Sequence, residues 1–110
     1  DEKGRLKIVD RKKDVIVVSG LYVYPDEVDD VVKKNPKVLD AAAIGVNDEE
    51  KGQVVKIFVV KKDFSLTEDE LRLYCDTHLK SGKSPEYIEF IKAIPRTNIG
   101  KVLRKKLRDL

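Results

Sequence analysis

Runs of apolar residues separated by charged turns divide the chain into short segments, and their spacing predicts its secondary structure. Alternating or β-branched runs, which favour strands, occur at residues 6–9, 15–18, 38–46, 54–60 and 87–91. Apolar stripes at helical spacing follow Pro25, Thr67 and Gly100. The predicted order is therefore hairpin, helix, two strands, helix, strand and helix.

Local signals set the boundaries of the predicted helices. Pro25 suits the first position of a helix, and Asn35-Pro36 should end that helix. The segment 67–70 reads as a capping box, in which the hydroxyl of Thr67 caps the helix and Glu70 reaches back. The last helix is expected to carry four apolar residues: Val102, Leu103, Leu107 and Leu110.

The arrangement of the predicted strands indicates the fold class. Residues 6–9 and 15–18 flank a charged turn and should pair as a hairpin, followed by a loop over residues 19–24. Residues 38–46 and 54–60 should form an antiparallel pair. The sequence thus predicts an α+β fold with an N-terminal β-hairpin, followed by a small, mostly antiparallel sheet with helices packed against it.

The composition is that of a charged chain that can fold. Of its 110 residues 41% are hydrophobic and 39% charged, and the apolar residues fall in periodic runs, which argues against disorder. The net charge of +3 is too small to imply nucleic-acid binding by itself. A single cysteine excludes an internal disulfide and a cysteine-based zinc site. No apolar run approaches the roughly eighteen residues of a membrane span.

Two residues with reactive side chains, Cys75 and His78, lie on the apolar side of the helix that follows Thr67. One cysteine and one histidine make a metal site improbable. We expect Cys75 to be a small core residue and His78 a packed or half-exposed structural one. The segment 81–84, SGKS, is similar to the end of a phosphate-binding loop. Thr77 occupies the position of a required glycine and the segment follows a helix, so we reject that interpretation.

Lys101 near the C-terminus has a distinctive setting. Gly100 before it permits a positive φ, and Pro95 and Thr97 restrict the preceding loop. A lysine offers a compact charge suited to phosphate and carboxylate oxygens. On these residues alone, an ordinary exposed lysine remains the simpler interpretation. The basic residues that follow are expected to form a solvated helix face: Arg104, Lys105, Lys106 and Arg108.

Two separated motifs change this interpretation: DRKKDVIVVSG followed by VYPDEV, and PRTNIGKVLR. The first, at residues 10–20 and 23–28, resembles the hinge segment of the adenylate-forming enzymes. These are the acyl-CoA synthetases, peptide-synthetase adenylation domains and luciferases. The second, at residues 95–104, resembles their terminal catalytic-lysine motif. The resemblance covers essentially the whole chain and is strongest to bacterial long-chain fatty-acid–CoA ligases.

The resemblance implies that the chain is a piece of a longer enzyme, which fits its start at Asp1. Residues 1–13 would be the end of an N-terminal domain and the hinge, and residues 14–110 a mobile C-terminal domain. The implied reaction joins a carboxylate and ATP to give acyl-AMP and pyrophosphate, and then forms a thioester with CoA after the domain rotates. The implied cofactors are ATP, magnesium and CoA, bound mainly by or with the N-terminal domain.

The resemblance also implies roles for four residues. Lys101 would be the catalytic lysine, whose charge contacts carboxylate and phosphate oxygens during adenylate formation. Arg11 would contact the adenylate ribose, and Lys13 would be the hinge that absorbs the rotation. Gly20 would lie in the loop that replaces Lys101 at the site after rotation, where CoA pantetheine passes the backbone. No metal ligand is implied in this chain.

The expected partners are the enzyme's own N-terminal domain, ATP or acyl-AMP, CoA and a fatty acid, without nucleic acid. The expected location is the cytoplasm, with a peripheral contact of the full enzyme at the cytoplasmic face of the membrane as a further expectation. The chain alone is predicted to be inactive. Two alternatives stay open: an adenylation module that loads a carrier-protein thiol, and an α+β interaction module whose basic helix binds nucleic acid or an acidic membrane.

Overall fold

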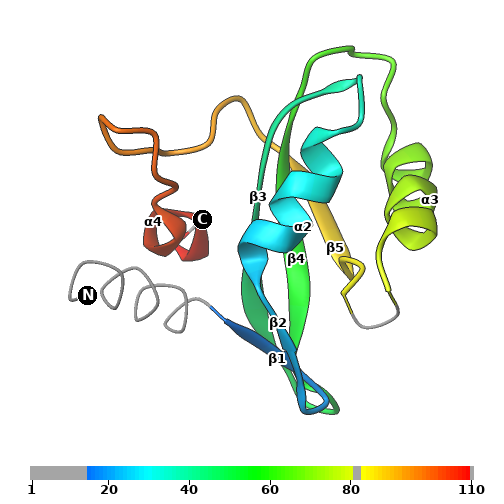
Figure 1. Cartoon of the computed structure of the whole chain (residues 1–110), viewed down its shortest axis with the longest axis vertical. Coiled ribbons are helices and arrows are strands. Elements are labelled where there is room, and N and C mark those ends of the chain that lie inside the picture. Colours follow the sequence, from blue (N-terminus) through cyan, green and yellow to red (C-terminus); the bar gives the residue numbers. More distant parts are fainter. Residues whose placement is uncertain (1–14, 81–82, 110) are drawn as a thin grey trace, which may run out of the picture.

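The structure, a computed structural model, describes residues 15–80 and 83–109, which form one five-stranded sheet with helices on both faces (Figure 1). Helices α2 (Pro25–Lys33) and α3 (Glu68–His78) cover one face. Helix α4 (Arg104–Arg108) packs on the other. The predicted α+β class is confirmed. Within the described ranges, no helix has the length and apolar character needed to cross a bilayer.

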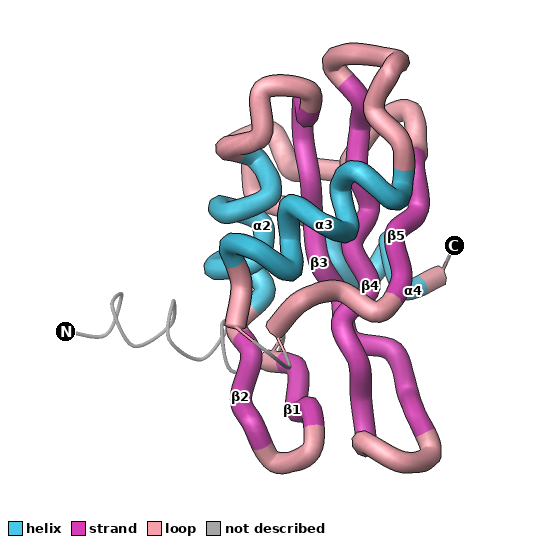
Figure 2. Tube along the Cα trace, turned by 90° about the vertical axis from the view of Figure 1, so that its right-hand side faces the viewer, coloured by secondary structure: helices cyan, strands magenta, loops and turns pink. Residues whose placement is uncertain are grey.

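Two long strands form the centre of the sheet. Strands β3 (Val38–Asp48) and β4 (Gly52–Lys61) are antiparallel, as predicted (Figure 2). The other edge of β4 is shared by two short strands. Strand β5 (Tyr87–Phe90) pairs with it in parallel, and β1 (Ile16–Val18) meets it in antiparallel orientation near the β3–β4 turn. The sheet is therefore mostly antiparallel.

A hairpin stands at the start of the described residues, but it is not the predicted pairing of residues 6–9 with 15–18, because β1 is its first strand. Strand β1 pairs with β2 (Leu21–Val23), which lies inside the segment 19–24 that was predicted to be a loop. Ser19 and Gly20 join the two strands with φ values of 50° and 84°. Two successive positive φ angles are typical of a type I′ hairpin turn, which suits the twist of the strands. The expected strand at residues 6–9 lies outside the described residues.

The predicted helix boundaries are largely confirmed. Helix α2 begins at Pro25, and α3 is capped by Thr67, whose Oγ1 accepts a hydrogen bond from the Glu70 amide at 3.1 Å. The carboxylate of Glu70, expected to reach back to Thr67, is instead paired with Lys37 at 2.9 Å. This ion pair connects α3 to the segment just before β3, so one half of the capping box is replaced by a tertiary contact.

Both faces of β3 are buried, which explains its run of small apolar residues. Ala41 and Ala43 face the cluster beneath α2 and α3, whereas Ala42 and Ile44 face the cluster beneath α4. A strand covered on two sides reads as a continuous apolar run rather than an alternating one. The small alanine side chains let the helices approach the strand closely. The hydroxyl of Tyr74 on α3 donates a hydrogen bond to the Val31 carbonyl on α2 at 3.1 Å and so connects these two helices.

Candidate functional site

The segment between β5 and α4 folds back on itself into a small hairpin, residues 95–103, which we call the lysine loop. Arg96 and Val102 pair across it as an antiparallel bridge. The loop projects from the body of the molecule, at the upper left of Figure 1. Because Val102 and Leu103 belong to this loop, helix α4 begins only at Arg104, and the prediction of a helix that includes them is wrong.

The tip of the lysine loop is a tight turn that fixes the backbone of Lys101. The Gly100 amide donates to the Thr97 carbonyl at 2.9 Å, and the Thr97 amide donates to the Lys101 carbonyl at 2.8 Å. The Lys101 amide donates to the Thr97 hydroxyl at 3.1 Å. Gly100 has a φ of 88°, which a glycine permits, and a Cβ there would meet no atom within 4 Å. Torsion, rather than space, therefore favours glycine.

Arg96 anchors the loop to β3. Its Nη2 and Nε donate to the two carboxylate oxygens of Asp40 at 2.6 and 3.0 Å, and its Nη1 donates to the Gly100 carbonyl at 2.6 Å. Hydrogen bonding to Asp40 raises the pKa of Arg96, so the guanidinium keeps its charge. Neither residue could be assigned a role from the sequence alone.

Arg104 anchors the far end of the loop, and it is buried. Its Nη1 donates to the Ala43 carbonyl at 2.9 Å, and its Nη2 donates to Asp26 at 2.7 Å and to Asp29 at 2.9 Å. Only 8% of the residue is exposed, so its assignment to a solvated helix face is wrong. The other basic residues of that face are exposed as predicted: Lys105, Lys106 and Arg108.

The partner of Arg104 on helix α2, Asp29, titrates in an unusual range. Burial raises the pKa of Asp29 from 3.8 to about 6, against the opposing effects of the Arg104 charge and the hydrogen bond from the Ala43 amide. Between these two values the folded chain binds more protons at this group than the unfolded chain does. The contribution of Asp29 to stability is therefore fully present below about pH 3.8 and declines as the pH rises through about 6.

Asp29→Asn should remove this component of the pH dependence. From about pH 4 to about pH 7, the free energy of unfolding of the native sequence should fall by about 3 kcal/mol relative to that of the variant. Urea denaturation at a series of pH values measures the difference. Asp30→Asn alters the exposed neighbour on the same helix and is the matched control, which should retain the decline. Parallel profiles for the native chain and Asp29→Asn would contradict the assignment.

The structure describes two of the four predicted site residues, Lys101 and Gly20. Lys101 is exposed on the lysine loop, and Gly20 is exposed in the β1–β2 turn at the bottom of Figure 1. The lysine loop and this turn are well apart in that view, so the two positions lie on different parts of the surface. Arg11 and Lys13 lie outside the described residues.

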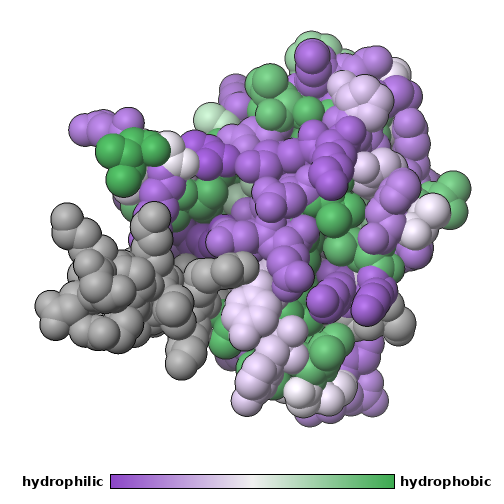
Figure 3. Space-filling model, viewed as in Figure 1, coloured by the Kyte–Doolittle hydropathy of each residue, from purple (hydrophilic) through white to green (hydrophobic). Residues whose placement is uncertain are grey.

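The surface around the lysine loop is predominantly polar. Hydrophilic residues cover most of the side seen in Figure 3, and the projecting loop combines hydrophilic and hydrophobic groups. At its tip Ile99 is 90% exposed. The tip of the lysine loop is therefore exposed to solvent, where it is accessible to another surface.

The other candidate chemistry does not produce a site. Cys75 is buried, and burial raises the pKa of its thiol to about 11, so the core role predicted for it is confirmed. His78 is exposed, with its ring centroid 4.3 Å from that of Tyr74. Among residues 15–80 and 83–109, no group of acidic, histidine or cysteine side chains could hold a metal ion. Ser81 and Gly82 of the rejected phosphate loop lie outside the described residues.

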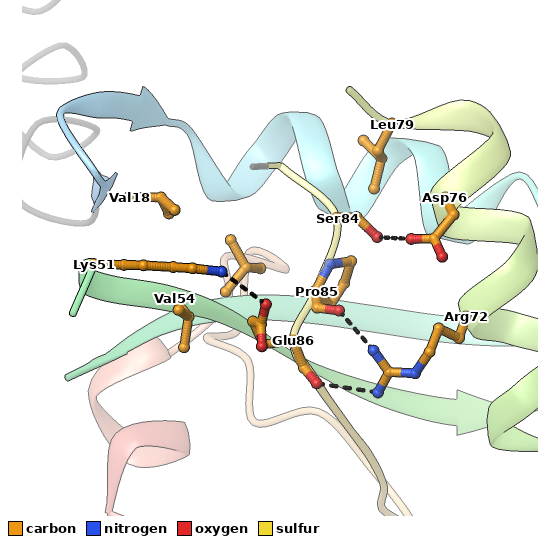
Figure 4. A pocket seen from close by; sticks show the side chains of 10 residues that line it. Val18, Lys51, Val54, Arg72, Asp76, Leu79, Ser84, Pro85 and Glu86 are labelled. Atoms are coloured by element: carbon orange, nitrogen blue, oxygen red, sulfur yellow. Dashed lines mark hydrogen bonds and ion pairs between the residues drawn. The ribbon is translucent and has the colours of Figure 1, made fainter. Parts of the chain in front are cut away.

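A pocket of about 510 Å³ lies among β1, β4, α3 and the segment before β5 (Figure 4). The two cations in its wall are held by protein groups. Arg72 donates to the carbonyls of Pro85 and Glu86 at 3.1 and 3.0 Å, and Lys51 pairs with the Glu86 carboxylate at 3.2 Å. These contacts fix the entry to β5, and the lysine loop remains the stronger candidate.

Comparisons with known proteins match both the sequence and the fold. The model of the AMP-binding enzyme C-terminal domain matches residues 27–101. A long-chain-fatty-acid–CoA ligase of Haemophilus influenzae is 57% identical over 109 residues, which are 99% of this chain and 19% of the relative. A solved Mycobacterium tuberculosis fatty acyl CoA synthetase has a TM-score of 0.81 and 37% identity over 88% of this chain and 19% of its own. The structure of ATP-bound MatB from Rhodopseudomonas palustris has a TM-score of 0.82 and 30% identity, over 89% of this chain and 20% of its own.

The chain spans about a fifth of the length of these relatives. The matched range begins in the first turn of α2, includes β3, β4 and β5, and ends at Lys101 on the lysine loop. It therefore covers the sheet and the candidate lysine together. The chain belongs to the AMP-binding enzyme C-terminal domain family.

Proposed function

We propose that residues 14–110 are the mobile C-terminal domain of an ATP-dependent long-chain fatty-acid–CoA ligase, and that residues 1–13 are the end of its N-terminal domain and the hinge. The observation that carries the proposal is Lys101, exposed on a loop tied to β3 at both ends. The 57% identity with a long-chain-fatty-acid–CoA ligase supports the substrate class.

Lys101 serves the first half of the proposed reaction. A fatty-acid carboxylate oxygen attacks the α-phosphorus of ATP, the bond to the β-phosphate oxygen breaks, and pyrophosphate leaves. Both reactants are anions, so a fixed ammonium between them lowers their repulsion and stabilises the charge that moves during transfer. The turn that holds both backbone polar groups of Lys101 limits reorganisation when the substrates bind.

Gly20 serves the second half. After rotation about Lys13, the β1–β2 turn takes the place of the lysine loop. The CoA thiolate then attacks the acyl carbonyl carbon, and the bond to the AMP phosphate oxygen breaks. Arg11 contacts the ribose of the AMP that leaves. The backbone at Gly20 is open, since a Cβ there would meet no atom within 4 Å, and pantetheine can pass closely. The separation of Gly20 from Lys101 on the surface supports alternation between two orientations.

ATP, CoA, a fatty acid and the enzyme's own N-terminal domain are the proposed partners. Magnesium would be held on the ATP phosphates, whose oxygens are the ligands that this cation prefers. We place the enzyme in the cytoplasm, with a peripheral contact at the cytoplasmic face of the membrane.

The two alternative functions are less well supported. Transfer to a carrier-protein thiol is not favoured, since the relative with 57% identity carries the name of a CoA ligase. A stand-alone module with a basic helix is not favoured either, since the chain belongs to an enzyme domain family and Arg104 is engaged in the interior.

The purified 110-residue chain should form no acyl-CoA, whereas a parent protein that contains it should form acyl-CoA, AMP and pyrophosphate from a long-chain fatty acid, ATP, magnesium and CoA. The physical reason is that the chain supplies one lysine and one turn, and the substrates are bound elsewhere. Chromatographic detection of acyl-CoA in both samples checks this. Turnover by the chain alone, or a parent protein inactive toward every long-chain acid, would contradict the proposal.

A further inference from the structure

The guanidinium of Arg96 links strand β3 to the peptide unit beside Lys101. Two of its nitrogens donate to Asp40 and the third donates to the Gly100 carbonyl at 2.6 Å. All three nitrogens are thus engaged. Because the guanidinium is planar and rigid, these contacts fix its orientation as well as its position.

Asp40 is itself held in place by the strand. The register between β3 and β4 shifts between Val38 and Asp40, and Oδ1 of Asp40 accepts a hydrogen bond from the Ala41 amide at 2.9 Å. Ala41 is fully buried. The Asp40 carboxylate is therefore held next to a buried part of the strand, and both of its oxygens accept hydrogen bonds from Arg96.

Polar contacts, rather than packing, hold the tip of the lysine loop. Ile99 at the tip is 90% exposed, so the tip has little apolar burial to restrain it. The Gly100 carbonyl belongs to the planar peptide unit that leads into Lys101, and an anchored oxygen therefore restrains the direction in which the Lys101 side chain departs.

We propose that Arg96 is a positioning residue: together with Asp40 it sets where the lysine loop presents the Lys101 ammonium, without contacting the substrate. The inference rests on the proposed function. By this inference the rate of adenylate formation depends on Arg96, although Arg96 contacts only Asp40 and the Gly100 carbonyl in the hydrogen bonds described above. A displacement of reacting groups of about 1 Å can lower a rate about a hundredfold, so the effect should be measurable.

The test measures the two half-reactions separately in the full-length parent enzyme. Arg96→Ala and the milder Asp40→Asn should each lower the rate of pyrophosphate release at saturating ATP by about tenfold or more. Both should leave the rate of thioester formation from supplied acyl-AMP and CoA unchanged. Arg96→Lys keeps the charge but loses the planar fork, and it should not restore the first rate. The double variant should be no slower than Arg96→Ala, because both changes break one connection.

Glu70→Gln is the matched control, since it removes the charge of another ion pair, formed between Glu70 on helix α3 and Lys37 at 2.9 Å, away from the lysine loop. It should leave both rates unchanged. Equal loss of both half-reactions in Arg96→Ala and Asp40→Asn, or no loss in either, would overturn the positioning role. Lys101→Ala distinguishes a failure of the proposed function from a failure of the positioning role of Arg96. If it blocks adenylate formation and the Arg96 variants do not, only this inference fails, whereas an unaffected Lys101→Ala enzyme removes the proposed function and the inference with it.

Discussion

Arg104→Ala should destabilise the folded chain by about 3 kcal/mol or more, the usual effect of breaking a buried ion pair from one side. The variant would leave Asp29 buried without its counter-charge and the Ala43 carbonyl without its donor. A 110-residue domain has only about 5–15 kcal/mol of stability, so the loss would be a large fraction of the total.

The deficit of Arg104→Ala should grow with pH. Loss of the Arg104 charge removes the main effect that lowers the pKa of Asp29, which then rises further above about 6. Above that pH the variant must bind a proton on folding or bury an unpaired carboxylate, whereas at about pH 4 the carboxyl is protonated at little cost. Urea denaturation at about pH 4 and at a pH well above 6 measures the deficit.

Lys105→Ala is the control for that experiment, because it removes an exposed charge from the same helix. It should change the free energy of unfolding by less than about 0.5 kcal/mol at either pH. Arg104→Lys should lie between the two, since it keeps a charge but not the fork of donors. A deficit of Arg104→Ala as small as that of Lys105→Ala would show that the buried cluster adds nothing to stability.

The fold could be predicted where apolar periodicity is long, and less well where strands are short. Strand β4 and the capped helix α3 were evident from their patterns. Strand β2 was missed because it has three residues, of which Leu21 is 42% and Tyr22 63% exposed, so it shows no buried alternation. The Ser19-Gly20 pair is a recognisable hairpin-turn signal, and it would have separated β1 from β2.

The contacts that support the candidate lysine could not be predicted from local pattern. Arg96 and Asp40 are 56 residues apart in the sequence, and Arg104 and Asp29 are 75 apart. Asp29 stands next to Asp30 in the run Val28-Asp29-Asp30-Val31-Val32, and the sequence alone did not distinguish the buried aspartate from its exposed neighbour. Lys101 itself was identified only through the resemblance of two motifs, since an exposed lysine after a glycine is otherwise unremarkable.

Lys101→Ala in the full-length parent enzyme should lower the rate of adenylate formation by about a hundredfold to a thousandfold, the range seen when one electrostatic contact to a transition state is removed. By the proposed role, the variant loses the charge between two anionic reactants, whereas the turn that carries residue 101 is kept. Its backbone hydrogen bonds with Thr97 do not involve the lysine side chain. Because the lysine side chain is exposed, stability should change by no more than about 1 kcal/mol.

Lys105→Ala and Lys101→Arg complete the comparison. Lys105 is another exposed lysine nearby, and its loss should leave both half-reactions unaltered. Arginine at position 101 keeps the charge on a longer and planar group, so it should recover part of the first rate. Full activity with alanine at position 101 would assign Lys101 to the ordinary exposed lysines.

The most direct measurement is the ratio of the two half-reaction rates in Lys101→Ala, with pyrophosphate release reporting adenylate formation and acyl-CoA appearance from supplied acyl-AMP reporting thioester formation. The expected result is a fall in this ratio of about a hundredfold or more relative to the native enzyme, with thioester formation preserved. An unchanged ratio, whether both rates fall together or neither falls, would contradict the role of this domain as the donor of the adenylation lysine.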